Sequence, residues 1–230
     1  MGNAFAALSD DPTALFWNPA GIVQIREISI FGQTKLDRSD FGFDPKGIAY
    51  RWRRLGLGWG NKIAVGLEGT PDYNYYSAAL KLSWRASVGL SLKFKRRHPC
   101  RYYQFFGYRR SADIGLLVFL NDSLSTAVVA REDDGWDELT VAGAYRGSGS
   151  ILDLDLIFRR SELPSLHLGA ELIPIHRLRV RGGFWTGDPD DGNGLSWGIG
   201  LYIGAFSLHY AWVRSSGKDS QHYLSAYLLR

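Results

Sequence analysis

RASVGLSLKFK, residues 85–95, alternates apolar and polar side chains almost without a break. Successive side chains of a β-strand point to opposite faces, so this stretch predicts a strand with two different faces. One face is apolar and the other is polar and charged. The apolar members are Ala86, Val88, Leu90, Leu92 and Phe94, and the polar members are Arg85, Ser87, Ser91, Lys93 and Lys95.

The same pattern recurs from residue 27 to the end of the chain. We count fourteen runs, at residues 27–35, 46–60, 62–70, 75–83, 85–96, 108–120, 122–132, 137–146, 149–160, 165–173, 176–185, 194–203, 205–214 and 220–229. In the second run the alternation slips at Arg53-Arg54, which suggests a β-bulge. Splitting or merging a run would give between twelve and sixteen strands.

The connections between the runs alternate between short and long. Tight turns are expected near Asn61, Trp84, Asn121, Ser148, Pro174 and Gly204, with longer loops between them. An up-and-down antiparallel barrel has this order when short turns lie at one end and longer loops at the other. An even number of strands places both ends of the barrel chain at the short-turn end.

Charged side chains follow the inward face of these runs. A dry interior would cost several kcal/mol for each desolvated charge, whereas a water-filled lumen removes that cost. A soluble barrel would reverse the two faces and needs a small, filled interior. We therefore predict an all-β, transmembrane β-barrel of about fourteen strands, in the outer membrane of a Gram-negative bacterium. The inward set includes Lys81, Lys93, Asp113, Arg131, Arg159, His167 and His209.

Composition supports one structural domain and excludes several classes. No apolar run reaches the length of a transmembrane helix. The net charge of +4 is spread over the strands, which argues against nucleic-acid binding. Cys100 is the single cysteine, so no internal disulfide forms. Because no signal peptide precedes the runs, we take the chain as a mature form with Met1 added for expression.

Residues 1–26 do not alternate, whereas residues 27–230 make up the expected barrel. Asp10 or Asp11 can cap a short helix with Pro12 at its first position, and Asn18-Pro19 ends it. The segment is apolar enough to require burial, and the lumen offers the volume. We predict a plug, or hatch, that enters the lumen from the short-turn end.

The hatch segment resembles a known family. ALSDDPTALFWNPAG, residues 7–21, is similar to the N-terminal hatch motif of the FadL-type outer-membrane superfamily. Stretches near residues 169–171, 178–183, 194–200 and 208–211 resemble the last strands of its PorV-like branch. The resemblance implies a fourteen-strand barrel with a hatch formed by Asp10, Asp11, Pro12, Trp17, Asn18, Pro19, Ala20 and Gly21. The loops are shorter than those of family transporters, and the chain ends Leu228-Leu229-Arg230 instead of on an aromatic residue.

No catalytic motif or cofactor-binding motif stands out, so we do not expect an enzyme or a cofactor. Asp188, Asp190, Asp191 and Asn193 form an acidic stretch that could bind calcium, but a solvated outer loop is the better interpretation, and we assign no metal.

Two sets of lumenal residues are candidates for function. The first is a polar network in which Glu171 lies across a tight turn from Arg179, and in which Asp153 and Asp155 could pair with Arg146 or Arg159. It serves either as a gate or hatch anchor, or as a brace of the wall. The second is an apolar ligand path, or else the surface on which the hatch packs. The network comprises Asp153, Asp155, Glu171, Arg177, Arg179 and Arg181, and the path comprises Phe119, Val129, Ile157, Trp185 and Tyr202.

Two functions follow from this reading. One is passive transport of a hydrophobic small molecule across the outer membrane. The other is a PorV-like scaffold that anchors or receives a secreted or partner protein. The expected surroundings are outer-membrane lipid and lipopolysaccharide, with a hydrophobic ligand or a protein as the specific partner.

Overall fold

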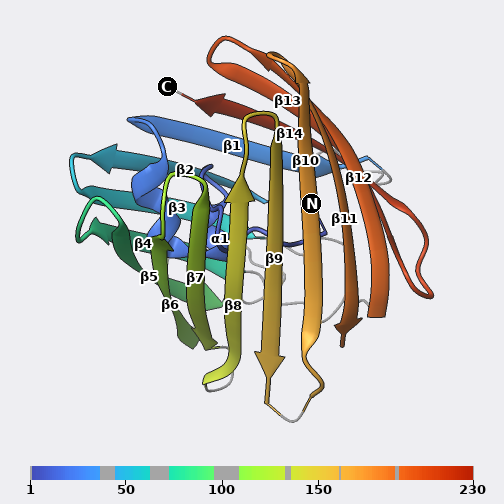
Figure 1. The fold of residues 1–230 in the computed structure, drawn as a ribbon. Helices are drawn as coiled ribbons and strands as arrows, with labels where there is room; N and C mark the ends of the chain where they lie inside the picture. The colour runs from blue at the N-terminus through green and yellow to red at the C-terminus, as the bar shows by residue number, and fades with distance from the viewer. Residues whose placement is uncertain are drawn as a thin grey trace, which may run out of the picture.

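A computed structural model describes residues 2–36, 45–62, 73–95, 109–132, 136–160, 162–189 and 192–229. Fourteen antiparallel strands close into a barrel in which each strand pairs with its neighbours in sequence, and β1 pairs with β14 (Figure 1). The strands are β1 Ile28–Lys35, β2 Lys46–Trp52, β3 Leu55–Lys62, β4 Tyr73–Lys81, β5 Ala86–Lys95, β6 Arg109–Phe119, β7 Leu124–Glu132, β8 Trp136–Arg146, β9 Ser150–Arg159, β10 Ser165–Ile175, β11 Leu178–Asp188, β12 Gly192–Ile203, β13 Phe206–Ser215 and β14 Gln221–Leu229. The predicted fold class, an all-β up-and-down barrel, is confirmed.

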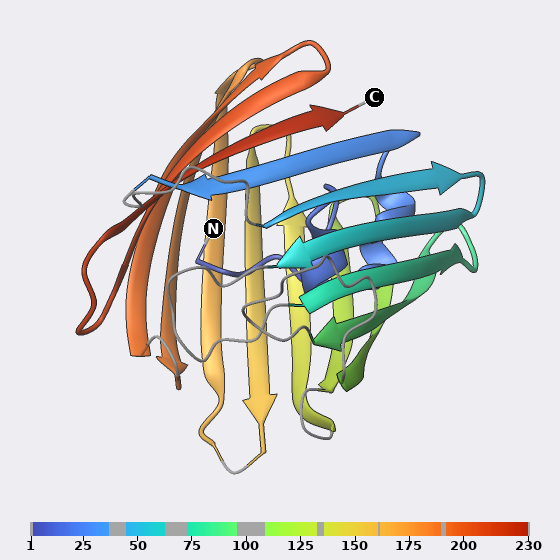
Figure 2. The same ribbon diagram turned by 180° about the vertical axis from the view of Figure 1, so that it is seen from behind.

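The two faces of the strands differ as the alternation predicts. In β5, Ser87, Ser91 and Lys93 are buried inside the barrel, while Leu90 and Leu92 are each 42% exposed on its outer face. The same contrast holds along the other strands, so an apolar band surrounds the barrel. Strands on the near and far walls cross at a large angle in Figures 1 and 2, as expected for strands tilted from the barrel axis.

One predicted strand was wrong, although the total of fourteen was right. Residues 46–60 are not one bulged strand: β2 ends at Trp52 and β3 begins at Leu55, and these two residues pair across a tight turn. Arg53 in that turn has a φ of +55°, a conformation that two-residue hairpins require and that usually selects Gly or Asn. Most of the predicted run 62–70 lies outside the described residues, and β3 pairs directly with β4.

The expected alternation of short and long connections holds only in part. The connections after β1, β3 and β5 are long, but those after β7 and β11 span three residues each, fewer than the four that join β4 to β5 and β6 to β7. Short turns join β2 to β3, β4 to β5, β6 to β7, β8 to β9, β10 to β11 and β12 to β13. Two of the six short turns predicted from sequence were misplaced: the turn expected near Asn61 lies at Arg53-Arg54, and Pro174 lies within β10, before the turn. The start of β1 and the end of β14 both lie at this short-turn end, where Ser29 pairs with Leu229.

The N-terminal segment, residues 2–26, lies inside the barrel. It contains α1, Ala14–Trp17, and the 3-10 helix η1, Pro19–Gln24. Ala6, Ala14, Leu15, Ala20 and Ile22 are fully buried against the inner wall. Asn18 has extended backbone between the two helices, as expected for a residue before proline. Within the described residues, neither helix is long enough to cross a bilayer.

Candidate functional site

A belt of small residues forms the seat of the N-terminal segment. Gly56, Ala79, Gly89 and Gly115 are paired in register across β3, β4, β5 and β6, and all face inward. A Cβ atom on Gly89 would lie 2.3 Å from the backbone nitrogen of Ala20, and one on Gly115 would lie 2.0 Å from Oδ1 of Asn18. At Gly89, backbone therefore packs directly on backbone, and at Gly115 the Asn18 side chain lies against the strand, close approaches that glycine permits.

Hydrogen bonds hold the segment to several strands around this seat. The Ser87 hydroxyl donates to the carbonyl of Ala20 (2.9 Å), and the Ser125 hydroxyl donates to the carbonyl of Ala7 (2.8 Å). The Arg131 guanidinium donates to the carbonyl of Trp17 at 2.6 Å. These contacts satisfy buried carbonyl groups that would otherwise destabilise the segment by about 1–3 kcal/mol each.

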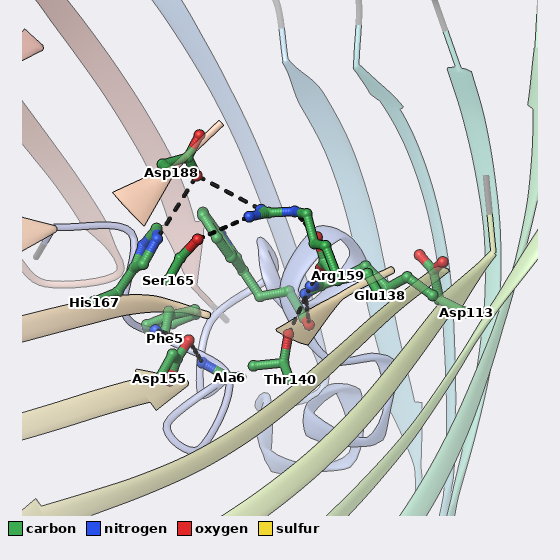
Figure 3. Close-up of polar contacts among 12 residues, drawn as sticks. Phe5, Ala6, Asp113, Glu138, Thr140, Asp155, Arg159, Ser165, His167 and Asp188 are labelled. Carbon is green, nitrogen blue, oxygen red and sulfur yellow. Dashed lines mark hydrogen bonds and ion pairs between the residues drawn. The ribbon is translucent and has the colours of Figure 1, made fainter. Parts of the chain in front are cut away.

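Asp155 on β9 provides the clearest anchor. Its Oδ2 accepts hydrogen bonds from the backbone N–H groups of Phe5 (3.1 Å) and Ala6 (3.2 Å), as Figure 3 shows for the labelled residues. The predicted pairing of Asp153 and Asp155 with Arg146 or Arg159 is wrong. Arg146 instead forms an ion pair with Asp10 at 2.8 Å.

The residues of the predicted hatch motif lie in three environments. Pro12, Asn18, Pro19, Ala20 and Gly21 are buried, and Asn18 ties the segment together because its amide donates to Ala6 and accepts from Ala20. Asp10 is exposed at the short-turn end beside Arg146. Trp17 and Asp11 are half-buried and line a cavity.

Glu171, Arg179 and Arg181 form the polar cluster expected in the lumen. The Glu171 carboxylate is buried and accepts from Arg179 Nη1 at 2.8 Å and from Arg181 Nε at 2.6 Å. Arg181 also contacts His209 (2.7 Å) and donates to the hydroxyl of Tyr202 (3.0 Å). The register of β10 and β11 places Arg181, and not Arg179, directly opposite Glu171.

Arg177 was wrongly assigned to this cluster. It lies in the two-residue turn between Ile175 and Leu178, which pair with each other, and its side chain is exposed.

A second ionic cluster, near the longer connections, was missed from the sequence. Glu138 on β8 binds both Arg131 and Arg159, and Arg159 also approaches Asp188 at 3.5 Å (Figure 3). Cross-strand register pairs Glu138 with both arginines, so a correct alignment of neighbouring strands would have found it. Asp188, which was expected in a solvated loop, is the last residue of β11, and its side chain is largely buried. Asp190 and Asp191 lie outside the described residues.

Two adjoining cavities lie between the N-terminal segment and the wall made by β1 and β10–β14. The short-turn cavity, about 330 Å³, includes Leu8, Asp11, Glu171, Arg179 and Tyr202. The long-loop cavity, about 450 Å³, includes Phe16, Trp185, Ser196, Val213 and Gln221. Their linings share six residues, which border both cavities and are here called the waist residues: Asn3, Thr13, Trp17, Gln33, Arg181 and Tyr227.

The five residues of the predicted ligand path do not form one path. Val129 and Phe119 pack in the apolar cluster beneath Ala6, Ala7 and Leu8, so they belong to the surface that the N-terminal segment covers. Ile157 is buried in the wall and lines neither cavity. Trp185 lines the long-loop cavity and Tyr202 lines the short-turn cavity.

Asp11 contributes a titratable group to the short-turn cavity. Burial, helped by the neighbouring charge of Asp10, raises the pKa of Asp11 to about 6. Its carboxylate accepts a hydrogen bond from the backbone N–H of Thr13 at 2.7 Å. No group of three or more potential metal-ligating side chains occurs within the described ranges.

Comparison with known proteins places the fold among outer-membrane barrels. No protein-family model and no curated protein sequence matches the chain. The toluene transporter TbuX of Ralstonia pickettii superposes with a TM-score of 0.75 over 100% of this chain and 96% of its own, at 12% identity. The outer membrane protein Omp33 of Acinetobacter baumannii gives a TM-score of 0.64 at 9% identity, covering 89% of this chain and 98% of its own. The Pseudomonas putida toluene transporter TodX gives 0.61 at 9% identity, covering 99% and 95%. At these identities the likeness concerns the fold.

Proposed function

We propose that this chain is an outer-membrane barrel that lets small, predominantly hydrophobic molecules cross passively, along a path beside its N-terminal segment. The observation that carries the proposal is the pair of adjoining cavities that share the waist residues Asn3, Thr13, Trp17, Gln33, Arg181 and Tyr227. One cavity reaches residues near the short turns, and the other reaches residues near the longer connections.

The lining suits a small molecule with an apolar body. The rings of Phe16, Trp17, Trp185, Tyr202 and Tyr227 offer aromatic surface along both cavities. Their volumes fall at the lower end of the range typical of small-molecule sites, about 300–1,000 Å³. Gln33 and Arg181 add hydrogen-bonding groups among the waist residues, so a solute with a polar group would also be accommodated.

In this proposal the N-terminal segment is a fixed hatch and the solute passes beside it. The close contacts at Gly89 and Gly115 and the hydrogen bonds from Ser87, Ser125 and Arg131 oppose its displacement. Membership of the FadL-type superfamily is part of the same proposal, and it is supported by the fold shared with two toluene transporters.

Uptake by proteoliposomes tests the proposal. Vesicles containing the protein should take up labelled toluene several-fold faster than protein-free vesicles, and Gln33→Trp should slow uptake because the larger ring narrows the space that the waist residues border. Thr126→Trp is the matched control, because Thr126 lies on the outer face of β7, where the ring would meet lipid. Equal rates for the protein, Gln33→Trp and empty vesicles would refute the proposal.

The second candidate is a scaffold barrel of the PorV-like kind, which anchors or receives a partner protein. The short connections support it: β7 ends at Glu132 and β8 begins at Trp136, and β11 ends at Asp188 and β12 begins at Gly192. Such loops offer little surface for gathering a ligand. Cross-linking in native outer membranes should then capture a specific protein, and the absence of any cross-linked protein would count against the scaffold.

A further inference from the structure

A patch of aromatic and basic side chains lies on two neighbouring short turns, outside the lumen. The turn between β2 and β3 carries Trp52, Arg53 and Arg54, and the turn between β4 and β5 carries Trp84 and Arg85. The turns lie side by side at the left edge of Figure 1 and the right edge of Figure 2. The backbone N–H of Lys81 donates to the carbonyl of Arg54 at 2.8 Å, which joins them.

The basic side chains of this rim patch are exposed and lack carboxylate partners among the described residues. Arg53, Arg54 and Arg85 are exposed, and no ion pair joins them to an acidic residue in the part of the chain that the structure describes. The Arg53 guanidinium lies 5.4 Å from the centre of the Trp52 ring, and that of Arg85 lies 3.9 Å from the Trp84 ring. Each tryptophan thus holds an arginine in place through a cation–π contact while leaving its N–H groups available.

The patch is continuous with the outer apolar band of the barrel. Tyr50 and Trp52 face outward near the end of β2 and are 45% and 57% exposed, and Leu57, Leu80 and Leu82 extend the apolar surface beside them. Tryptophan and tyrosine are enriched where a membrane protein passes from hydrocarbon to headgroups. The arginines therefore lie at headgroup height, on the side of the short turns.

We propose that this rim patch binds the phosphate headgroup of anionic glycerophospholipids in the leaflet next to the short turns. Guanidinium groups bind phosphate through paired, charge-assisted hydrogen bonds, and the tryptophan rings would lie against the glycerol and the first acyl carbons. Lipid is favoured over a protein partner because the patch is continuous with the outer apolar band of the barrel, so that a lipid could contact both at once.

Native mass spectrometry of the protein in mixed micelles of phosphatidylglycerol and phosphatidylcholine tests the inference. The unaltered protein should retain phosphatidylglycerol preferentially. A triple variant, Arg53→Asn, Arg54→Gln and Arg85→Gln, should lower that preference about ten-fold or more, since each basic residue near a surface contributes substantially to binding anionic lipid. Asparagine is chosen for position 53 because it tolerates the positive φ found there.

The matched control removes the same charge from other exposed positions, with Arg160→Gln, Arg177→Gln and Arg214→Gln. It should leave the preference unchanged. An unchanged preference in the rim variant, or an equal loss in the control, would overturn the inference. If the rim variant fails to fold, loss of the preference at high salt in the unaltered protein supports the site, and retention of it does not.

The inference rests on the membrane placement proposed above, and the two can fail separately. A protein that inserts into vesicles and transports solute without preferring phosphatidylglycerol would overturn the headgroup site alone. A protein that does not insert would overturn the proposed function. Binding of purified lipopolysaccharide through the same three arginines, with phosphatidylglycerol ignored, would assign the patch to a different lipid and refute this one.

Discussion

The two halves of the lumen differ in the size of the side chains that face inward. Along β3 to β6 one inward-facing row consists of Gly56, Ala79, Gly89 and Gly115, and the N-terminal segment packs closely on it, while larger side chains such as Tyr75 and Lys93 face inward elsewhere on these strands. Along β10 to β14 the inward-facing side chains include Glu171, Arg181, His209 and Tyr227, and cavities separate this wall from the segment. A strand pattern that looks uniform in polarity thus places a seat for the N-terminal segment on one side and cavities on the other.

The contrast teaches that inward volume, more than inward polarity, decides where the lumen is filled. Small residues let the segment approach until backbone meets backbone, which buries apolar side chains such as Leu15 and Ile22. The long side chains of the other wall bind one another, as Arg181 binds Glu171, His209 and Tyr202. Cavities remain between this wall and the segment.

The largest effect is expected from a substitution that fills the glycine seat with a side chain. Gly89→Val would place its Cβ 2.3 Å from the backbone of Pro19 and Ala20, where no side chain can move aside. We expect a loss of about 3 kcal/mol or more in unfolding free energy, at the upper end for overpacked cores, and release of the N-terminal segment. Urea unfolding in lipid vesicles and protease sensitivity of the segment measure the two effects.

Gly143→Val and Gly182→Val are the controls for the seat. Both glycines face outward, and a Cβ on either would have no atom within 4 Å. Each should change the unfolding free energy by less than about 1 kcal/mol. A loss at Gly143 or Gly182 equal to that at Gly89 would show that any added side chain destabilises the strands, and the seat would lose its special role.

A smaller effect is expected from loosening the segment while its seat remains. Asn18→Ala removes the hydrogen bonds from its amide to Ala6 (2.9 Å) and from Ala20 to its Oδ1 (3.0 Å), both fully buried. The unpaired groups should lower the unfolding free energy by about 2 kcal/mol. Hydrogen exchange should rise at Ala20 and remain unchanged in the strands. Equal exchange in both proteins would mean that the wall alone orders the segment.

Sequence reasoning reached the barrel and the buried segment because both follow from local patterns. The alternation of side chains, the lengths of the connections and the helix end at Asn18-Pro19 can each be recognised from a few consecutive residues. The seat could not be predicted because it depends on which glycines lie opposite one another across four strands. Treating Arg53-Arg54 as a bulge within one strand gave the wrong pairing of residues between these strands. A two-residue turn made of arginines carries none of the usual glycine or asparagine signals.

The same limit explains the misassigned polar residues. Arg177 was placed in the network by its spacing from Glu171, but β10 extends to Ile175 and pairs there with Leu178, so Arg177 lies in the turn. The partners of Asp155 are backbone N–H groups of Phe5 and Ala6, which no side-chain pattern reveals. Pairs of side chains on neighbouring strands can be predicted once the strand register is known. Contacts between a strand and the irregular N-terminal segment can be predicted only when the course of the segment's backbone is known.

The smallest effect is expected at Asp11, where the N-terminal segment borders the short-turn cavity. Its pKa is raised to about 6, so the folded protein holds this proton more tightly than the unfolded chain. The resulting stability is complete below the unfolded pKa of about 4 and is lost as the pH rises through 6. Because the group is half-buried, we expect only about 1 kcal/mol.

Asp11→Asn isolates this contribution from those of the other carboxylates. The variant keeps an oxygen that accepts from the Thr13 N–H but cannot ionise, so its unfolding free energy should exceed that of the unaltered protein near pH 7 and match it near pH 4. Urea titrations at both pH values give the difference. A difference in unfolding free energy that does not change with pH would mean that Asp11 is solvated as an ordinary surface carboxylate. The short-turn cavity would then be open to bulk water beside Asp11. That result would weaken the contrast between the two halves of the lumen.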